Sequence, residues 1–218
     1  MKGYQEPRLP NHLELAERPE ELLYMERIQQ ETLMGWKIVS GNFSEEDLSD
    51  MNIQGCVFQG CRFSGCNLKG TSFTDVVFRN CDFSGSQAKN LFAKRCEFVN
   101  VKALGAQWLS GHLECVTIRQ SNFSQANLSD STMQQVRMEE VEFVESWLNE
   151  CKWKQLELKG CNFTRTSFFK TTLKGLDFTS GDLHGIVVSD DGRELKGAVV
   201  NSRQAVSLAS ILGVIVRE

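Results

Sequence analysis

A strict period of five residues dominates this sequence. From Ile38 to Val188 every fifth residue is apolar, which makes 31 consecutive positions without an insertion. Many of these residues are Phe, including Phe58, Phe63 and Phe83. A period of five fits neither an α-helix, with about 3.6 residues per turn, nor a strand, with a repeat of about two. The chain must therefore fold as short segments separated by regular corners.

Two further columns of residues keep the same register. The residue two places before each apolar centre is small in most units, as in Cys56, Thr71 and Ala126, with exceptions such as Leu91. The residue between these two columns is polar in most units, as in Asn67. One large and one small side chain per unit would then point inward, while the other positions face outward or form a corner. One such coil cannot bury a core, but stacked coils share one.

The units CRFSG, CNLKG, CDFSG, ANLSD and CNFTR resemble the signature of the pentapeptide-repeat family, and the repeats cover residues 36–190, or 155 of 218 residues. The resemblance implies an all-β solenoid, a right-handed quadrilateral β-helix with four units per coil and about eight coils. At a strand spacing of about 4.8 Å the rod would be about 37 Å long. Residues 1–35 would form an N-terminal extension with a capping helix, and residues 191–218 a C-terminal cap.

The chain has eight Cys, and the repeat register explains seven of them. These seven occupy the small inward position, and only Cys115 does not. The run of Cys56, Cys61 and Cys66 would place successive thiols on different sides of a coil, which is poor geometry for a metal site. We interpret the cysteines as core fillers and expect no metal and no cofactor. With no signal peptide and no apolar run of membrane-spanning length, we expect a cytoplasmic protein with reduced thiols.

The residues outside the repeats predict two caps. Residues 19–34 are interpreted as a helix that begins at Pro19 and closes at Gly35, and residues 1–18 as loosely structured. Near the other end, residues 195–200 are expected to form a last strand. Ser202 can cap a helix that runs through Leu212 and stops at Gly213, followed by a short strand over residues 214–216.

The apolar side chains of the C-terminal segment need a partner surface. They could serve as an intramolecular cap or as a two-fold dimer contact, and both roles are compatible. We favour the dimer. The predicted interface residues are Ala205, Leu208, Ala209, Leu212, Val214 and Val216.

The C-terminal segment SRQAVSLASILGVIVRE, following an uninterrupted rod, resembles that of the Qnr-type quinolone-resistance proteins, and most of all the loop-free chromosomal members of Gram-positive bacteria. The resemblance implies a rod homodimer, joined through the C-terminus, that binds DNA gyrase and often topoisomerase IV. It further implies partial mimicry of DNA and protection of the enzyme from quinolones. The formal net charge of −4 argues against direct binding of nucleic acid.

Charge excludes uniform mimicry of DNA. B-DNA carries about one charge per 1.7 Å of axis, so a rod of about 37 Å would need roughly 22 negative charges. The repeat region has 8 Asp and 10 Glu against 10 Lys and 6 Arg, a net charge of −2. Any mimicry must therefore be confined to part of the surface.

Grouping units at steps of twenty residues gives four faces with different charges. The first face, centred on Phe43, and the adjoining second face, centred on Leu48, together carry 11 acidic and 6 basic residues, a net charge of −5. The third face, centred on Ile53, has 2 acids and 5 bases, and the fourth face, centred on Phe58, is balanced at 5 and 5. Either the acidic pair of faces meets a basic DNA-binding saddle, or it is ordinary solvated surface. The predicted partner-binding residues are Glu46, Asp47, Asp50, Asp82, Asp130, Glu142, Glu145, Glu150 and Asp190.

Nothing in the sequence suggests catalysis. Of the three His residues, His112 and His184 lie in the repeats at different register positions, and no phosphate-binding glycine loop stands apart from the repeats. We expect no enzyme activity. The alternative to a topoisomerase-protecting protein is another pentapeptide-repeat interaction module, such as an immunity factor against a gyrase toxin or a scaffold. Three small centres, Ala88, Ala93 and Ala103, leave open whether the middle of the rod is kinked.

Overall fold

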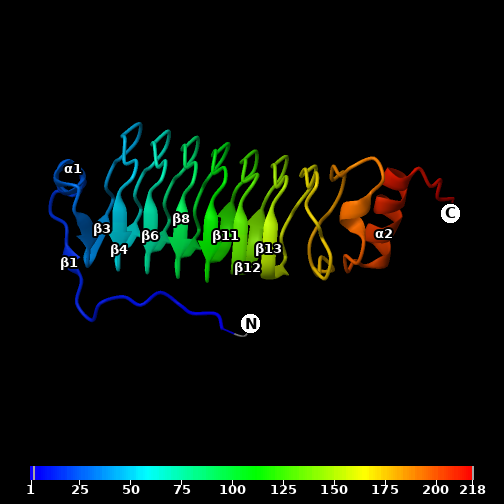
Figure 1. Ribbon diagram of the computed structural model, residues 1–218, viewed down its shortest axis with the longest axis horizontal. Helices are drawn as coiled ribbons and strands as arrows, with labels where there is room; N and C mark the ends of the chain where they lie inside the picture. Colours follow the sequence, from blue (N-terminus) through cyan, green and yellow to red (C-terminus); the bar gives the residue numbers. More distant parts are fainter. Residues whose placement is uncertain (2, 218) are drawn as a thin grey trace.

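The protein is a straight rod wound from short segments, with helices at its two ends (Figure 1). A computed structural model describes residue 1 and residues 3–217, and for Leu212 the backbone alone. The chain forms a parallel β-solenoid of about seven turns, close to the eight coils expected. Within the described residues, no helix has both the length and the apolar character that crossing a bilayer requires.

Two faces of the rod are built from ladders of short parallel strands. Strand partners are 20 residues apart, as in the pairing of Phe58 with Phe78, so four five-residue units make one coil. The third face contains β2 (Thr32–Met34), β4 (Asn52–Gln54), β6 (Ser72–Thr74), β8 (Phe92–Lys94) and β10 (His112–Glu114). The fourth face contains β3 (Trp36–Val39), β5 (Val57–Gln59), β7 (Val77–Arg79) and β9 (Glu97–Val99). The longer strands β11 (Thr117–Asn122), β12 (Thr132–Glu142) and β13 (Lys152–Lys159) continue around corners.

The first and second faces are held by single bridges between successive coils, such as Asn42 with Arg62 and Asp47 with Asn67. The last residue of most units has a positive φ, which turns the chain at each corner. Gly65 has φ of 66°, and the residue one coil earlier, Glu45, has φ of 61°. Glycine adopts this conformation without steric cost, whereas other residues adopt it at some cost.

Stacked phenylalanine rings fill the rod. Phe58, Phe78 and Phe98 are fully buried and stack with ring centroids 5.1 and 5.0 Å apart. Phe63 and Phe83 form a second stack, 4.7 Å apart, that meets the first edge-on. Offset-stacked and edge-to-face pairs are the arrangements that aromatic rings prefer. The large apolar residues of the repeat therefore point inward, as predicted.

Buried thiols occupy the small inward positions. The thiol of Cys81 donates to the carbonyl of Phe58 at 3.6 Å, and that of Cys96 to the carbonyl of Phe73 at 3.5 Å. The same bond, to a carbonyl 23 residues earlier, recurs at Cys151. These thiols fill space in the core, in agreement with the core-filler interpretation, and also bond to the preceding coil.

The small centres in the middle of the rod do not bend it. Leu91 occupies an inward position and is buried, and Trp108 fills the core one coil above Ala88. The indole N–H of Trp108 donates to the hydroxyl of Ser86 at 2.9 Å. The 20-residue register continues through β6, β8 and β10, and Figure 1 shows evenly stacked coils there. Local repacking, not a kink, accommodates these alanines.

The prediction of a helix over residues 19–34 is wrong at its C-terminal end. Helix α1 spans Pro19–Gln29, and Gln30 ends it in a left-handed conformation with φ of 56°. Strand β2 follows, with Leu33 fully buried. Leu33 lies five residues before Ile38 and belongs to the apolar series, so the solenoid begins before residue 36. The stacking of Leu33 under Ile53 outweighs the local helical pattern.

Residues 1–18 were expected to be loosely structured; residues 3–13 indeed form no helix or strand, but they are held against the rod and residues 14–15 form a strand. Residues 3–13, the N-terminal arm, run along the side of the rod over several coils, below it in Figure 1. Strand β1 (Glu14–Leu15) then pairs in parallel with β3. The tyrosine hydroxyl of Tyr4 bonds to that of Thr117 at 2.6 Å, which fixes the arm far from the end of the rod.

The C-terminal segment covers the end of the rod as a cap. A short 3-10 turn over Arg193–Leu195 and a single bridge between Asp177 and Val199 replace the strand expected over residues 195–200. Helix α2 spans Ser202–Ala209 and continues as a 3-10 turn to Leu212. Its cap is Asn201 rather than Ser202.

The end of the C-terminal segment departs from the prediction in one respect. Gly213 ends the helical segment in a left-handed conformation, as predicted. Residues 214–216 form no strand, which corrects the prediction. They extend past the cap and pair with no strand among the described residues.

Candidate protein-binding faces

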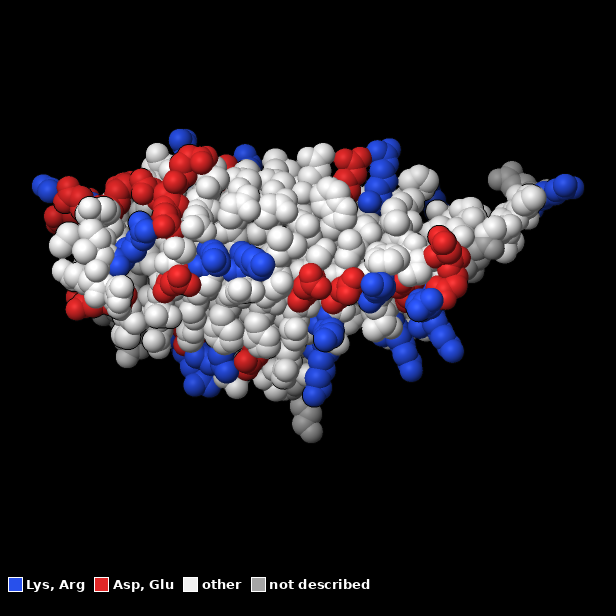
Figure 2. Space-filling model, turned by 45° about the horizontal axis from the view of Figure 1, so that its top comes forward, with Lys and Arg blue, Asp and Glu red and all other residues white. Residues whose placement is uncertain are grey.

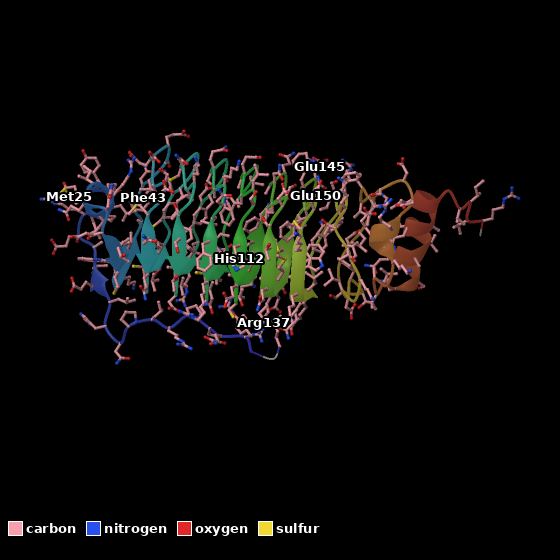
Figure 3. The ribbon with its side chains drawn as sticks, in the orientation of Figure 1. Met25, Phe43, His112, Arg137, Glu145 and Glu150 are labelled. Carbon is pink, nitrogen blue, oxygen red and sulfur yellow. The ribbon has the colours of Figure 1, made fainter. Side chains whose placement is uncertain are left out.

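The first and second faces meet along one corner of the rod, and the N-terminal arm lies along the diagonally opposite corner. In Figure 3 Glu145 and Glu150 lie at the upper edge of the rod, whereas Arg137, which contacts the arm, lies at the lower edge. The two acidic faces are therefore free of other parts of the chain along most of the rod.

Three of the nine predicted partner-binding acids are paired with basic residues of the same chain. Asp47 pairs with Arg27 at 2.5 Å, Glu145 with Arg165 at 2.7 Å and Glu150 with Lys170 at 3.2 Å. Each partner lies 20 residues away, so it belongs to the neighbouring coil or, for Arg27, to α1. The net charge of each face includes these acids and bases, but it does not reveal that they form ion pairs with one another.

The local environment lowers the pKa of two of these paired carboxyl groups. The pKa of Asp47 is lowered by hydrogen bonds from Ser49 and by the charge of Arg27. The pKa of Glu145 is lowered by hydrogen bonds from Gln125 and Arg165. Both groups are therefore ionised at neutral pH, but each negative charge is paired with a positive charge of the same chain.

The other six predicted acids have no basic partner among the described residues. They are Glu46, Asp50, Asp82, Asp130, Glu142 and Asp190. Glu142 accepts a hydrogen bond from the side-chain amide of Asn162 at 2.8 Å. Figure 2 shows acidic side chains gathered at the N-terminal end of the rod and scattered beyond it. The charge forms separate patches, not a continuous stripe.

An exposed tryptophan lies within the acidic second face. Trp147 is 44 % exposed and lies between Glu145 and Glu150 in the sequence of one coil. Phe169, which is 41 % exposed, lies one coil further on, next to Asn149. Exposed aromatic residues dominate the energetics of many protein interfaces. We did not predict these residues, although Trp147 breaks the rule that the outward column is polar.

The N-terminal arm covers the corner between the third and fourth faces. The backbone N–H of Arg8 donates to Asp75 at 2.9 Å, and the guanidinium of Arg137 lies 3.8 Å from the ring centre of Tyr4. Near the first coils Pro10 crosses Gly55, where a Cβ atom would lie 3.1 Å from the proline ring. A side chain at position 55 would therefore press against the arm, and Pro10 would have to shift by a few tenths of an ångström.

Several residues near this corner are buried although their positions should face outward. Val57 and Val77 lie in the outward polar column yet are only 8 % and 2 % exposed. Cys115, the one cysteine outside the inward column, is 2 % exposed and donates to the side-chain oxygen of Gln135. These corner and outward positions could have signalled that a further segment of the chain packs there.

The predicted dimer residues divide between cap and surface. Leu208 is buried against the end of the rod, so it serves the intramolecular cap. Ala205 is exposed and Ala209 is half-buried, while Val214 and Val216 are 53 % and 49 % exposed. The side chain of Leu212 lies outside the described residues. Two further apolar residues that we did not predict, Val206 and Ile215, are 53 % and 83 % exposed.

The buried groups offer little chemistry. Burial raises the pKa of Cys56 to about 11 and of Cys66, Cys96 and Cys151 to about 12, so these thiols stay protonated. The described residues contain no group of three or more His, Cys, Asp or Glu side chains placed to hold a metal ion. His112 stacks on Phe92, with ring centroids 5.5 Å apart.

Comparison with known proteins agrees with the coil geometry. A family model described as a pentapeptide repeat region matches residues 39–108, and one described as eight copies of pentapeptide repeats matches residues 154–185. These matches and the four-unit coil define a pentapeptide-repeat β-solenoid. The chain belongs to the pentapeptide-repeat family. Solenoids of this family are structural or interaction modules and not typically enzymes.

Solved structures of other pentapeptide-repeat proteins are similar to the chain. A trypsin-treated variant of QnrB1, a plasmid-mediated fluoroquinolone resistance protein, is 24 % identical with a TM-score of 0.38, covering 94 % of this chain and 95 % of that one. HetL, from the cyanobacterium Nostoc sp. strain PCC 7120 and involved in regulating heterocyst differentiation, is 12 % identical with a TM-score of 0.33, covering 78 % and 90 %. No curated protein matches the sequence.

Proposed function

We propose that the protein binds DNA gyrase, and also topoisomerase IV, and protects the enzyme from quinolones. The resemblance of the C-terminal segment to Qnr-type proteins suggests this partner. The observation that carries the proposal is the acidic pair of faces, with Trp147 uncovered and the arm packed on the opposite corner. The proposal places the protein in the cytoplasm and gives it no catalytic step.

The free acids and the exposed aromatic residue have different roles in this proposal. Asp82, Asp130 and Glu142 would face lysine and arginine side chains that otherwise contact DNA phosphates. Charge complementarity of this kind accelerates encounter and sets orientation more than it adds affinity. Trp147 would supply affinity by packing against the partner, because tryptophan is enriched among residues that dominate binding energy. The mimicry of DNA is therefore local, limited to patches of free carboxylates.

Dimerisation through the C-terminal segment is part of the proposal. Val206 of α2 and Val214 and Ile215 of the segment after it are exposed apolar residues. A two-fold contact between copies would bury them and double the length of the rod. The apolar residues of one copy would then be covered by the same residues of the other.

Gyrase supercoiling in the presence of ciprofloxacin, across a titration of the protein, tests the proposal. Restored supercoiling at low protein concentration is the expected result. Inhibition without rescue would instead indicate a competitor of DNA for gyrase. Absence of any effect on gyrase and on topoisomerase IV would contradict the proposal.

A second candidate function is a pentapeptide-repeat interaction module with another partner, such as an immunity factor against a gyrase toxin or a scaffold. The pairing of Asp47, Glu145 and Glu150 with basic residues favours it, because the rod then offers less free negative charge than a DNA mimic needs. Rescue of gyrase from a toxin, without rescue from ciprofloxacin, would distinguish this function from the first.

A further inference from the structure

The two ends of the rod are closed to different extents. At the C-terminal end the buried side chain of Gln204 donates to the carbonyls of Phe178 and Gly181, at 2.8 and 2.9 Å. At the N-terminal end β1 adds a strand next to β3, with Ala16 N–H bonded to the Lys37 carbonyl at 3.0 Å. No described strand covers the first and second faces of the first coil, so this end of the solenoid is only partly capped.

The uncapped part is an open β-edge. The backbone N–H of Asn42 donates to the carboxylate of Glu20 at 2.7 Å. Among the described residues, nothing accepts the N–H of Asp47 or donates to the carbonyls of Asn42 and Asp47. One coil later the equivalent backbone groups are hydrogen-bonded. The N–H of Asn67 donates to the carbonyl of Glu46, and the carbonyl of Asn67 accepts from the N–H of Leu48. Unpaired strand edges bind further extended segments.

An apolar cleft lies beside this edge, between α1 and the first coil. Its volume is about 500 Å³, and its lining includes Leu23, Phe43 and Leu48, which are themselves buried. Tyr24 and Met25 border it and are 60 % and 49 % exposed. In Figure 3 Met25 and Phe43 lie at this end of the rod. The cleft can therefore receive an apolar side chain from a segment that pairs with the edge.

The charge around the cleft is strongly negative. Residues 18–50 carry 8 acidic and 3 basic residues, a net charge of −5, whereas the whole chain has a net charge of −4. Two of the three basic residues are already paired, Arg18 with Glu21 and Arg27 with Asp47. Figure 2 shows this acidic cluster at the N-terminal end. A segment bound here would have to be basic.

We propose that this cleft binds an extended segment of a partner protein in which an apolar side chain is flanked by lysine or arginine. The open edge selects an extended backbone, the exposed side chains of Tyr24 and Met25 select the central apolar side chain, and the acidic rim selects the flanking charges. Strand addition at a sheet edge is a general mode of peptide recognition. The site shares Glu46 and Asp47 with the second face, but its test uses a peptide and no gyrase, so it can fail while the proposed binding of gyrase stands.

Fluorescence anisotropy with a labelled peptide, Lys-Val-Ile-Val-Arg-Lys, tests the proposal on the full chain. Met25→Asp and Glu46→Lys should each weaken binding at least about tenfold. Both side chains are exposed, so the variants should keep the circular dichroism and melting temperature of the parent. The matched control is Asp182→Lys, an exposed acid of the first face near the other end, and it should leave the affinity within about twofold.

Two further peptides test the backbone and charge requirements. N-methylation at alternate backbone nitrogens should abolish binding, and so should replacement of the basic residues by Glu. Equal affinity of the parent, Met25→Asp and Glu46→Lys for the first peptide would overturn the proposal, as would tight binding of the N-methylated peptide. If the chain itself assembles end to end and Met25→Asp abolishes that assembly, the occupant is a second copy and the assignment to a partner protein is wrong.

Discussion

The ion pair between Asp75 and Arg95 is expected to stabilise the rod far more than the exposed ion pairs with the same 20-residue spacing. Two nitrogens of Arg95 bond to the two oxygens of Asp75, both at 2.6 Å, and the side chains are 14 % and 6 % exposed. The N–H of Arg8 donates to the same carboxylate. Removing one partner of a buried pair leaves an uncompensated charge and costs about 3–5 kcal/mol.

Asp75→Asn should therefore lower the free energy of unfolding by about 3 kcal/mol, the lower end of that range, because Arg95 retains some contact with water. For a chain of this size the melting temperature should fall by about 6–12 °C. Urea unfolding measures the loss, and hydrogen exchange at the Arg8 amide should accelerate as the arm loosens. The matched control is Glu139→Gln, which breaks the exposed pair with Lys159 and should leave unfolding nearly unchanged. Equal losses for the two variants would refute the reasoning.

The same pair predicts a dependence on pH. Burial alone would raise the pKa of Asp75, but the hydrogen bonds and charge of Arg95, with the Arg8 N–H, outweigh it and lower the pKa below the ordinary value of 3.8. The unfolded chain then takes up this proton at a higher pH than the folded chain. The stabilisation is complete above pH values near 3.8 and is lost as the pH falls through the lowered pKa. The difference in stability between the parent and Asp75→Asn should shrink across that acidic range.

Three other substitutions or treatments follow from the same structure. Phe78→Ala, in the middle of the ring stack, should cost about 3–5 kcal/mol in urea unfolding, and a loss below about 1 kcal/mol would mean that the core is not packed as described. Trp147→Ala should weaken gyrase binding at least about thirtyfold without shifting the melting temperature, and unchanged affinity would remove Trp147 from the interface. A thiol reagent at mildly alkaline pH should fail to label Cys96, whose pKa is raised by burial to about 12, until the chain is unfolded in urea. Rapid labelling of Cys96 in the native protein would contradict its place in the core.

The repeat region could be predicted because one rule decides every side chain in it. A centre such as Phe78 can be buried only if its neighbours at steps of 20 residues stack above and below it, so period and fold are linked. The rule also extends to Leu33. Because the residues around it favour a helix, however, the predicted start of the solenoid was too late in the sequence. Burial of Leu33 under the next coil outweighed the intrinsic preference of the segment.

The arm could not be predicted in the same way, because its contacts join residues far apart in the sequence. Tyr4 bonds to Thr117, and Arg8 to Asp75, with no local pattern that announces either contact. The sequence feature that could have indicated a covering segment lies in the repeats, where Val57 and Val77 interrupt the outward polar column.

The acidic faces were only partly predictable. Net charge per face follows from the repeat register. The ion pair that neutralises Glu145 with Arg165, by contrast, depends on which charged residues lie in the same column of neighbouring coils. The exposed aromatic residue among these acids, Trp147, is a departure from the polar column whose exposure only the structure could establish.

The affinity of DNA gyrase for charge-reversed rods tests the central claim most directly. Asp130→Lys with Glu142→Lys reverses two free acids of the first and second faces, and Glu139→Lys with Asp177→Lys makes the same change of net charge on the fourth face. The first pair should weaken binding at least about tenfold, and the second should change it by no more than about twofold. Equal affinities for the two double variants would contradict the account, because the acidic faces would then not be the surface that binds.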